Sequence, residues 1–211
     1  TKVPLNGAIQ KGQNILVIEG RKVNNITGPG CHARVEDFNN HAPTEVEAVY
    51  IVGDFHVVRI DDGTFYIDNR SKYPAPYHGN ISISGYPFYA GKIKFSSQFE
   101  YTGSSPAGKR LLLKVNDVHA AYIKLYLNGK PISTKYWAPY VFDITGHVQK
   151  GINRIEIIAS TTLFNLMGPN RIANILDITF VGPSTFINFD RFTSKYELLP
   201  YGISNCVLEE R

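Results

Sequence analysis

The sequence predicts an all-β sandwich, and three observations support this fold class. Short segments of alternating apolar and polar residues recur along the 211 residues, separated by turns that use many of the 18 Gly and 12 Pro. Asn128-Gly129 joins two such segments and predicts a hairpin, because both residues tolerate positive φ. The 13 Tyr and 12 Phe suit pleated strands, and 43% hydrophobic residues suffice for a core.

Charge and hydropathy exclude two classes of partner. The net charge is +4, but Lys and Arg are scattered rather than clustered, so we expect no nucleic-acid partner. No run approaches the roughly 18 apolar residues of a membrane span, so we expect no membrane partner. The opening segment, TKVPLNGAIQKG, lacks Met and an apolar signal core and begins inside a patterned segment. We therefore expect the chain to be a piece of a longer protein.

The predicted strands share alternating or continuous apolar side chains between turn residues. They lie within residues 10–19, 45–60, 64–67, 85–101, 110–115, 121–127, 140–144, 154–159, 175–181 and 203–208. The clearest is 121–127, where Ile123, Leu125 and Leu127 are expected to face inward and Tyr122, Lys124 and Tyr126 outward. Residues 20–43 and 163–171 are predicted loops. An aromatic cluster in the tail, Phe186, Phe189, Phe192 and Tyr196, has spacings that would allow a short helix.

Two segments of the chain resemble each other. QKGQNILVIE at 10–19 matches QKGINRIEII at 149–158, each with a Lys-Gly turn before a predicted strand. A single sandwich has little reason to repeat this unit, although such turns are common. We therefore expect residues 1–43 to be the C-terminal remnant of a preceding β-sandwich, or added strands, and residues 44–211 to form the complete sandwich.

Three motifs follow one another along the chain: Tyr126-Leu-Asn-Gly129, Pro139-Tyr-Val-Phe-Asp-Ile-Thr145 and Lys150-Gly-Ile-Asn153. Together they resemble the galactose-binding-like, sugar-binding jelly-roll domains of bacterial glycoside hydrolases. Two further stretches, Gly85-Tyr-Pro-Phe-Tyr-Ala-Gly91 and Val52-Gly-Asp-Phe55, look like the C-terminal β-sandwiches of enzymes similar to α-L-rhamnosidases. The resemblance covers roughly residues 45–211. It implies a jelly-roll sandwich that is accessory to a catalytic domain elsewhere in the same polypeptide.

The residue types in these motifs predict structural roles in turns rather than contacts with a ligand. Asn128 and Gly129 should close a hairpin, and Asp143 should brace the turn at Thr145. Gly151 should supply a backbone conformation that other residues resist, and Asn153 should bond the backbone of its turn.

Carbohydrate-binding candidates are Tyr136, Trp137, Tyr140, Asn165 and Arg171. Aromatic rings can stack on the C–H faces of sugars, and the two polar residues could bond hydroxyl groups. The interpretation we favour for Trp137 is structural: it plugs the end of the sandwich while Pro139 holds the loop. Asn165, Asn170 and Arg171 could equally brace an interface with a catalytic domain.

No catalytic motif is evident. A glycosidase needs two carboxylates in one cleft, and the available residues, Asp61, Asp62, Glu100, Asp117, Asp143 and Asp177, stand in no recognisable arrangement. The six His show no close metal-ligand spacing. We expect no catalytic residues, no metal ligands and no cofactor, although the fold could accommodate a structural Ca²⁺.

The sequence thus predicts a non-catalytic accessory domain of a larger glycoside hydrolase, with a glycan as a weak ligand and an extracellular or periplasmic parent enzyme. An independent carbohydrate-binding module and an adhesion domain of a surface protein remain alternatives, because fold alone does not choose among them.

Overall fold

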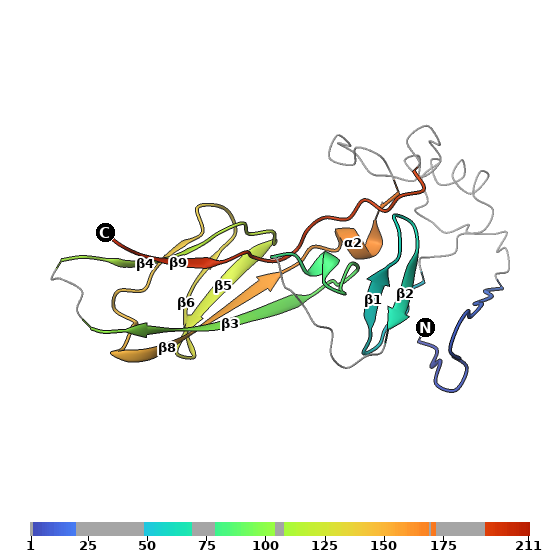
Figure 1. Cartoon of the computed structure of the whole chain (residues 1–211), viewed down its shortest axis with the longest axis horizontal. Helices are drawn as coiled ribbons and strands as arrows, with labels where there is room; N and C mark the ends of the chain where they lie inside the picture. Colours follow the sequence, from blue (N-terminus) through green and yellow to red (C-terminus); the bar gives the residue numbers. More distant parts are fainter. Residues whose placement is uncertain (1, 20–48, 69–78, 104–107, 169, 172–192) are drawn as a thin grey trace, which may run out of the picture. The chain divides into compact units, whose positions relative to one another are not determined.

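The computed structural model describes residues 2–19, 49–68, 79–103, 108–168, 170–171 and 193–211. The chain divides into two compact units, Thr1–Ile51 and Val52–Arg211. The elements of the second unit, in chain order (Figure 1), are β1 (His56–Arg59), β2 (Phe65–Asp68), η1 (Ile81–Ile83), β3 (Lys92–Tyr101), β4 (Leu111–Val115), β5 (Tyr122–Leu127), β6 (Lys130–Lys135), β7 (Val141–Asp143), β8 (Gly151–Ser160), α2 (Phe164–Met167) and β9 (Cys206–Glu210). The predicted all-β class is confirmed.

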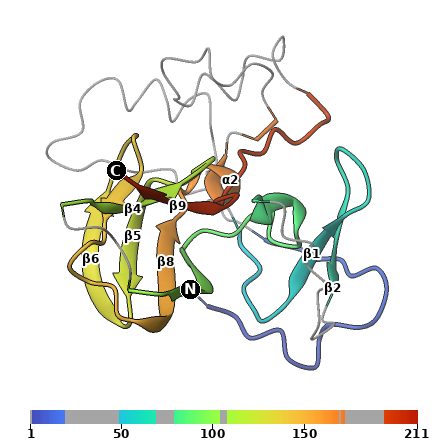
Figure 2. The ribbon, with the colours of Figure 1, turned by 60° about the vertical axis from the view of Figure 1, so that its left-hand side comes forward.

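Two antiparallel sheets form a β-sandwich (Figures 1 and 2). Four strands pair in the order β3-β8-β5-β6, and three pair in the order β7-β4-β9. The core lies between the sheets, because one cluster of buried side chains draws on both of them, including Leu113 from β4, Phe142 from β7, and Leu125 and Ile157 from β5 and β8. The chain changes sheet between consecutive strands of the sandwich except at the β5–β6 hairpin.

Strand β5 lies at the centre of the core, as its alternation predicts. Ile123, Leu125 and Leu127 are 0%, 0% and 1% exposed. They pair across the sheet with alternate residues of β8, Leu125 opposite Ile157, for example. Burying each such side chain contributes about 1.5–3 kcal/mol.

The β5–β6 connection is the predicted Asn-Gly hairpin. Asn128 and Gly129 have φ of 51° and 78°, the left-handed values of a tight hairpin turn. The register shifts by one residue between Leu125 and Tyr126, so β6 carries a bulge opposite this point. Pro131 is tolerated in β6 because β6 is an edge strand of its sheet.

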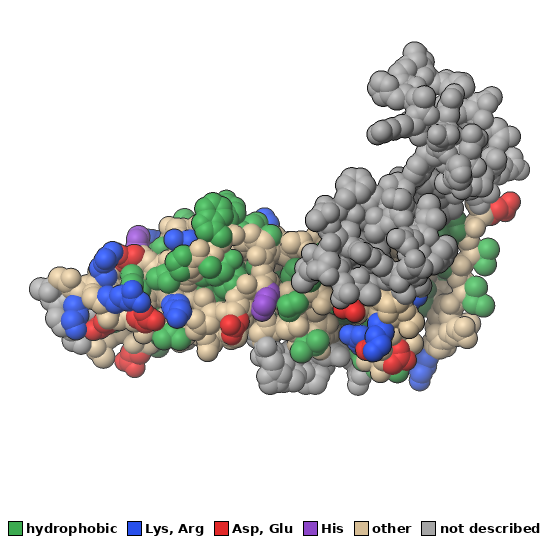
Figure 3. Space-filling view, turned by 90° about the horizontal axis from the view of Figure 1, so that it is seen from above, with side chains coloured by type: hydrophobic (Ala, Val, Ile, Leu, Met, Phe, Trp, Pro, Cys, Tyr) green, Lys and Arg blue, Asp and Glu red, His purple; other side chains and the backbone are tan. Residues whose placement is uncertain are grey.

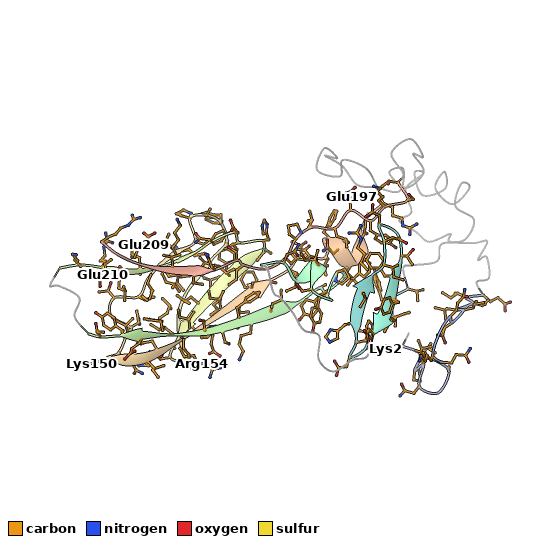
Figure 4. All side chains as sticks on the ribbon, in the orientation of Figure 1. Lys2, Lys150, Arg154, Glu197, Glu209 and Glu210 are labelled. Atoms are coloured by element: carbon orange, nitrogen blue, oxygen red, sulfur yellow. The ribbon has the colours of Figure 1, made fainter. Side chains whose placement is uncertain are left out.

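Strand β8 begins with a turn that Asn153 fastens from inside the sandwich. Gly151 has φ of 93°, and the fully buried Asn153 accepts the Gln149 N–H at 2.9 Å through Oδ1. Its Nδ2 donates to the carbonyls of Gln149 and Gly151 at 2.7 and 3.0 Å. Lys150 lies within this turn and Arg154 follows it in β8; both are labelled in Figure 4.

The turn after β7 is braced by Asp143. Its Oδ1 accepts the Thr145 hydroxyl at 2.6 Å and the Thr145 N–H at 3.1 Å. The Thr145 hydroxyl oxygen in turn accepts the Leu111 N–H at 2.9 Å, which ties this turn to the start of β4.

Strands β1 and β2 form a separate two-stranded hairpin. Asp61 Oδ1 accepts the N–H groups of Gly63 and Thr64, both at 2.8 Å, and so fixes the turn. Phe65 of β2 meets Phe88 and Tyr196 edge to face, with ring centroids 4.9 and 5.1 Å apart. These contacts join the hairpin to segments that precede β3 and β9.

Three predictions about elements need correction. Residues 15–18 form no strand and their apolar side chains are exposed, because the described part of the chain supplies no neighbouring strand to cover them. In the 45–60 segment, residues 49–55 are not in a strand, and pairing with β2 begins only at His56. Within the predicted loop 163–171, Phe164–Met167 forms a single helical turn.

Some predicted features lie outside the described residues. These are residues 45–48 of the predicted strand 45–60, the predicted strand 175–181, and the aromatic residues Phe186, Phe189 and Phe192. Within the ranges given above, no helix is long and apolar enough to cross a membrane.

Candidate functional site

Outward-facing side chains of β5 and the loop after β6 gather into an exposed aromatic group. The exposed aromatic group consists of the exposed Tyr136 and Trp137 and the half-buried Tyr122 and Tyr126, with Lys124 between the two β5 tyrosines. The strand period of two brings Tyr122, Lys124 and Tyr126 to the same face of the sheet, opposite the buried face of β5. Figure 3 shows hydrophobic side chains reaching the surface of the sandwich among Lys and Arg side chains.

Trp137 projects into solvent, which corrects the favoured interpretation that it plugs the sandwich. It is 75% exposed and Tyr136 is 60% exposed. Tyr140, three residues further along the chain, is the aromatic residue that packs against the buried cluster, and it is only partly exposed. Tyr140 is therefore less accessible to a ligand than Tyr136 or Trp137.

The rings of the aromatic group lie side by side but are not coplanar. The centroids of Tyr122 and Tyr136 are 5.9 Å apart with an interplanar angle of 50°. Those of Tyr136 and Trp137 are 6.1 Å apart at 39°. The group thus presents a faceted surface, on which a planar ligand could stack on one ring at a time.

Lys124 supplies the positive charge of this surface. Its Nζ lies 4.9 Å from the centroid of the Tyr126 ring, within the range of a cation–π contact. The Tyr126 side chain, followed by Tyr122 and Tyr136, holds the pKa of Lys124 above its usual value. Lys124 therefore stays protonated at neutral pH and can donate hydrogen bonds beside the rings.

The structure buries Asn165 inside the protein. It is fully buried, its Nδ2 donates to the Leu199 carbonyl at 2.9 Å, and its Oδ1 accepts the Leu199 N–H at 2.9 Å. The Ser82 hydroxyl also lies 3.3 Å from Nδ2. With these partners, Asn165 fastens the segment before β9 to α2 and η1 and cannot reach a sugar in solvent.

Arg171 belongs to a different group of contacts from the exposed rings. Its guanidinium carbon lies 4.5 Å from the centroid of Tyr196. Its carbonyl accepts the Thr193 N–H at 3.0 Å, and the neighbouring Asn170 carbonyl accepts the Glu197 N–H at 2.7 Å. Arg171 and Asn170 therefore hold the 193–197 segment in place.

Three of the candidate carboxylates, Asp61, Asp62 and Asp143, have a lowered pKa, whereas a glycosidase acid requires a raised one. The pKa of Asp61 is lowered by the Gly63 N–H and that of Asp62 by Lys195. That of Asp143 is lowered by the Thr145 hydroxyl. Each of these carboxylates serves a turn or an ion pair, and Asp177 lies outside the described residues. Among those residues, no group of three or more His, Cys, Asp or Glu could hold a metal ion.

Sequence reasoning named Tyr136, Trp137 and Tyr140 but missed Tyr122, Lys124 and Tyr126 as members of the site. The signal was present, because these three alternate with the inward residues of β5 and precede the aromatic loop. The proximity of Tyr122 to Tyr136 could be inferred only from the hairpin pairing, which sets Ile123 opposite Lys135.

No protein-family model matches this sequence, and no curated protein matches it. Among solved structures, a rhamnosidase from Novosphingobium sp. PP1Y matches 80% of this chain and 16% of its own, with 22% identity and a TM-score of 0.46. A Bifidobacterium dentium β-glucuronidase matches 65% of this chain and 25% of its own, with 16% identity and a TM-score of 0.40. A Bacteroides fragilis protein assigned as a β-galactosidase matches 57% of this chain and 15% of its own, with 15% identity and a TM-score of 0.35. The chain therefore spans a quarter or less of these three proteins, and it is similar in structure to segments of such glycoside hydrolases.

Proposed function

We propose that the sandwich is a non-catalytic accessory domain of a larger glycoside hydrolase and that it binds carbohydrate weakly through the exposed aromatic group. The observation that carries the sugar-binding part is the exposure of Trp137 and Tyr136 beside Tyr122. The accessory part is supported by the order of the three sequence motifs, from 126 to 153.

Stacking on these rings explains why a sugar would bind here. The axial C–H groups of a pyranose form an apolar face that removes water from an indole or phenol ring when the two stack. Lys124 lies on the same face of β5 as Tyr122 and could donate a hydrogen bond to a hydroxyl or carboxylate of the sugar. An open surface buries much less of a ligand than a closed pocket, so the affinity should be low.

The tilt between the rings favours one kind of carbohydrate. A crystalline polysaccharide presents many sugar rings in one plane and needs coplanar aromatic rings to match it. Because Tyr122, Tyr136 and Trp137 are inclined by 50° and 39° to their neighbours, a short or flexible glycan fits better. We expect soluble oligosaccharides to bind and insoluble crystalline polysaccharide to be retained poorly.

Glycan-array screening of the 211-residue chain, followed by calorimetry with the best soluble oligosaccharide, tests this function. Trp137→Ala should lower the affinity by about tenfold or more, since a lost stacking contact costs on the order of 1–2 kcal/mol. Tyr66→Ala is the matched control, because Tyr66 is also an exposed ring but lies on β2. Circular dichroism should show that both variants fold.

Two outcomes would overturn the proposal. Failure to bind any glycan on the array would remove the sugar-binding role. An equal loss of affinity in Trp137→Ala and Tyr66→Ala would show that the exposed aromatic group is not the binding surface.

A further inference from the structure

Two turns far apart in the sequence make the same set of hydrogen bonds. In residues 10–14, Asn14 Oδ1 accepts the Gln10 N–H at 2.9 Å, and Asn14 Nδ2 donates to the carbonyls of Gln10 and Gly12 at 2.8 and 3.0 Å. In residues 149–153 the corresponding distances around Asn153 are 2.9, 2.7 and 3.0 Å. The glycines agree as well, with φ of 102° at Gly12 and 93° at Gly151.

The residues that follow the two turns differ in their surroundings. After Asn153, strand β8 runs between β3 and β5, and its inward residues Ile155 and Ile157 are buried. The corresponding residues after Asn14 are Leu16 and Ile18, at 58% and 50% exposed, while the intervening Ile15 and Val17 are both 82% exposed. The alternation of exposure therefore follows that of β8, but the segment lacks covering strands among the described residues.

In the sandwich, the β5–β6 turn completes the bonding of this site. Asn128 Nδ2 donates to Asn153 Oδ1 at 2.9 Å, and Asn128 Oδ1 accepts the Arg154 N–H at 2.9 Å. The Arg154 carbonyl also accepts the Asn128 N–H at 2.9 Å. The turn at residues 10–14 presents the groups that correspond to those bonded by Asn128, namely Asn14 Oδ1 and the N–H and carbonyl of Ile15. Among the described residues, the side chain of Asn14 bonds only within its own turn.

The Asn6-Gly7 pair close by does not play the part of Asn128-Gly129. It belongs to a local turn in which the Ala8 N–H donates to the Leu5 carbonyl at 3.0 Å, and the chain then runs directly into Gln10. In the sandwich, by contrast, β6 and β7 lie between Asn128 and Gln149. Both neighbours of β8, namely β3 and β5, also precede it in the sequence.

We propose that residues 10–19 are the counterpart of β8 in a second sandwich and that they bind a β-hairpin of the same polypeptide, N-terminal to Thr1. The hairpin carries an Asn-Gly turn, whose Asn donates to Asn14 Oδ1 and accepts the Ile15 N–H. Its alternating apolar residues flank Leu16 and Ile18 in the same sheet, as Leu127 and Leu125 of β5 lie opposite Ile155 and Ile157. This proposal rests on the repeated turn and is independent of the carbohydrate-binding function.

Hydrogen exchange tests this by comparing the 211-residue chain with the natural polypeptide extended at its N-terminus. The amides of Ile15 to Glu19 should exchange freely in the shorter chain and about 100-fold or more slowly in the extended one. In the extended polypeptide, Asn14→Ala should reduce this protection. Lys11→Ala, in the same exposed turn, should leave it unchanged.

Equal and fast exchange of residues 15–19 in both chains would overturn the proposal. Slow exchange in the shorter chain that increases with protein concentration would also overturn it, because a second copy would then be the occupant. If protection in the extended polypeptide survives Asn14→Ala without loss, the proposed pairing of an Asn-Gly turn with Asn14 is wrong.

Discussion

The side chains of Asn128 and Asn153 form a 2.9 Å hydrogen bond that joins the β5–β6 turn to the first residues of β8. Asn128 Nδ2 is the donor and Asn153 Oδ1 the acceptor, and the same Oδ1 accepts the Gln149 N–H at 2.9 Å. One carbonyl oxygen therefore connects two turns that are 25 residues apart. The sandwich depends on this connection because Asn153 is buried and its polar atoms have no access to water.

The Asn128–Asn153 bond should appear as an energetic coupling in a double-mutant cycle. Asn153→Ala should lower the free energy of unfolding by about 3 kcal/mol, since several buried donors and acceptors lose their partner. Asn128→Gly removes the side chain while keeping the positive φ, and it should cost about 1 kcal/mol. The double variant should lose less than the sum, by about 1 kcal/mol. Urea denaturation of the four proteins measures this.

Gln149→Ala provides the control for this cycle. The Gln149 side chain makes one exposed bond, to the Ile152 carbonyl at 3.3 Å, while its backbone bonds to Asn153 remain. Combined with Asn128→Gly, its effect should be additive within about 0.5 kcal/mol. Additivity of Asn128→Gly with Asn153→Ala as well would show that the side-chain bond contributes nothing to stability.

Turns and central strands could be predicted from the sequence because local residue chemistry determines them. Asn128-Gly129 adopts its turn through φ values that few residues tolerate, and β5 follows from a period of two. The exposure of Trp137 could not be predicted in this way. It depends on which of two aromatic residues, Tyr140 or Trp137, packs against the core, and the local sequence does not distinguish them.

The exposed segment 15–18 shows a second limit of sequence-based prediction. Four consecutive apolar residues predict a strand covered on both faces, but a strand exists only where neighbours bond its backbone. The described part of this chain offers none, so only the preceding turn, closed by Asn14, takes the expected geometry. The local part of the prediction holds and the long-range part does not.

The carboxylate of Asp143 should become protonated only at a pH below the usual range of carboxyl pKa values. The Thr145 hydroxyl and then the Thr145 N–H lower its pKa from 3.8, because both donate to the charged form. Since the folded pKa lies below the unfolded one, this contribution to stability is present above pH 3.8 and is lost as the pH falls through the folded pKa. Carbon-13 NMR of the carboxyl group measures the titration.

Thr145→Val should raise the pKa of Asp143 toward its usual value, because the hydroxyl donor is removed while the backbone donor remains. Thr134→Val, on β6, makes the same chemical change elsewhere and should leave the titration of Asp143 as it was. An unchanged pKa in Thr145→Val would mean that the hydroxyl does not stabilise the carboxylate.

Trp137 should report its own exposure by fluorescence, since it is the only Trp in the chain. Acrylamide should quench its emission in the native protein nearly as strongly as in urea, because the side chain is 75% exposed. Adding a soluble oligosaccharide that binds the aromatic group should reduce the quenching. Strong protection from acrylamide in the free native protein would instead support a buried plug and contradict the exposed aromatic group.

Alanine substitutions at two glycines should separate backbone conformation from packing. A Cβ would have nothing within 4 Å at either Gly151 or Gly146, so neither substitution creates a steric clash with a neighbour. Gly151 has φ of 93°, and an alanine there should cost about 1–3 kcal/mol of strain. Gly146 has no positive φ, so Gly146→Ala should be neutral or stabilise the fold by up to about 1 kcal/mol through the unfolded state. Thermal and urea unfolding of the two variants measure the difference. Equal stabilities would show that the backbone of Gly151 relaxes to negative φ without loss of the Asn153 turn.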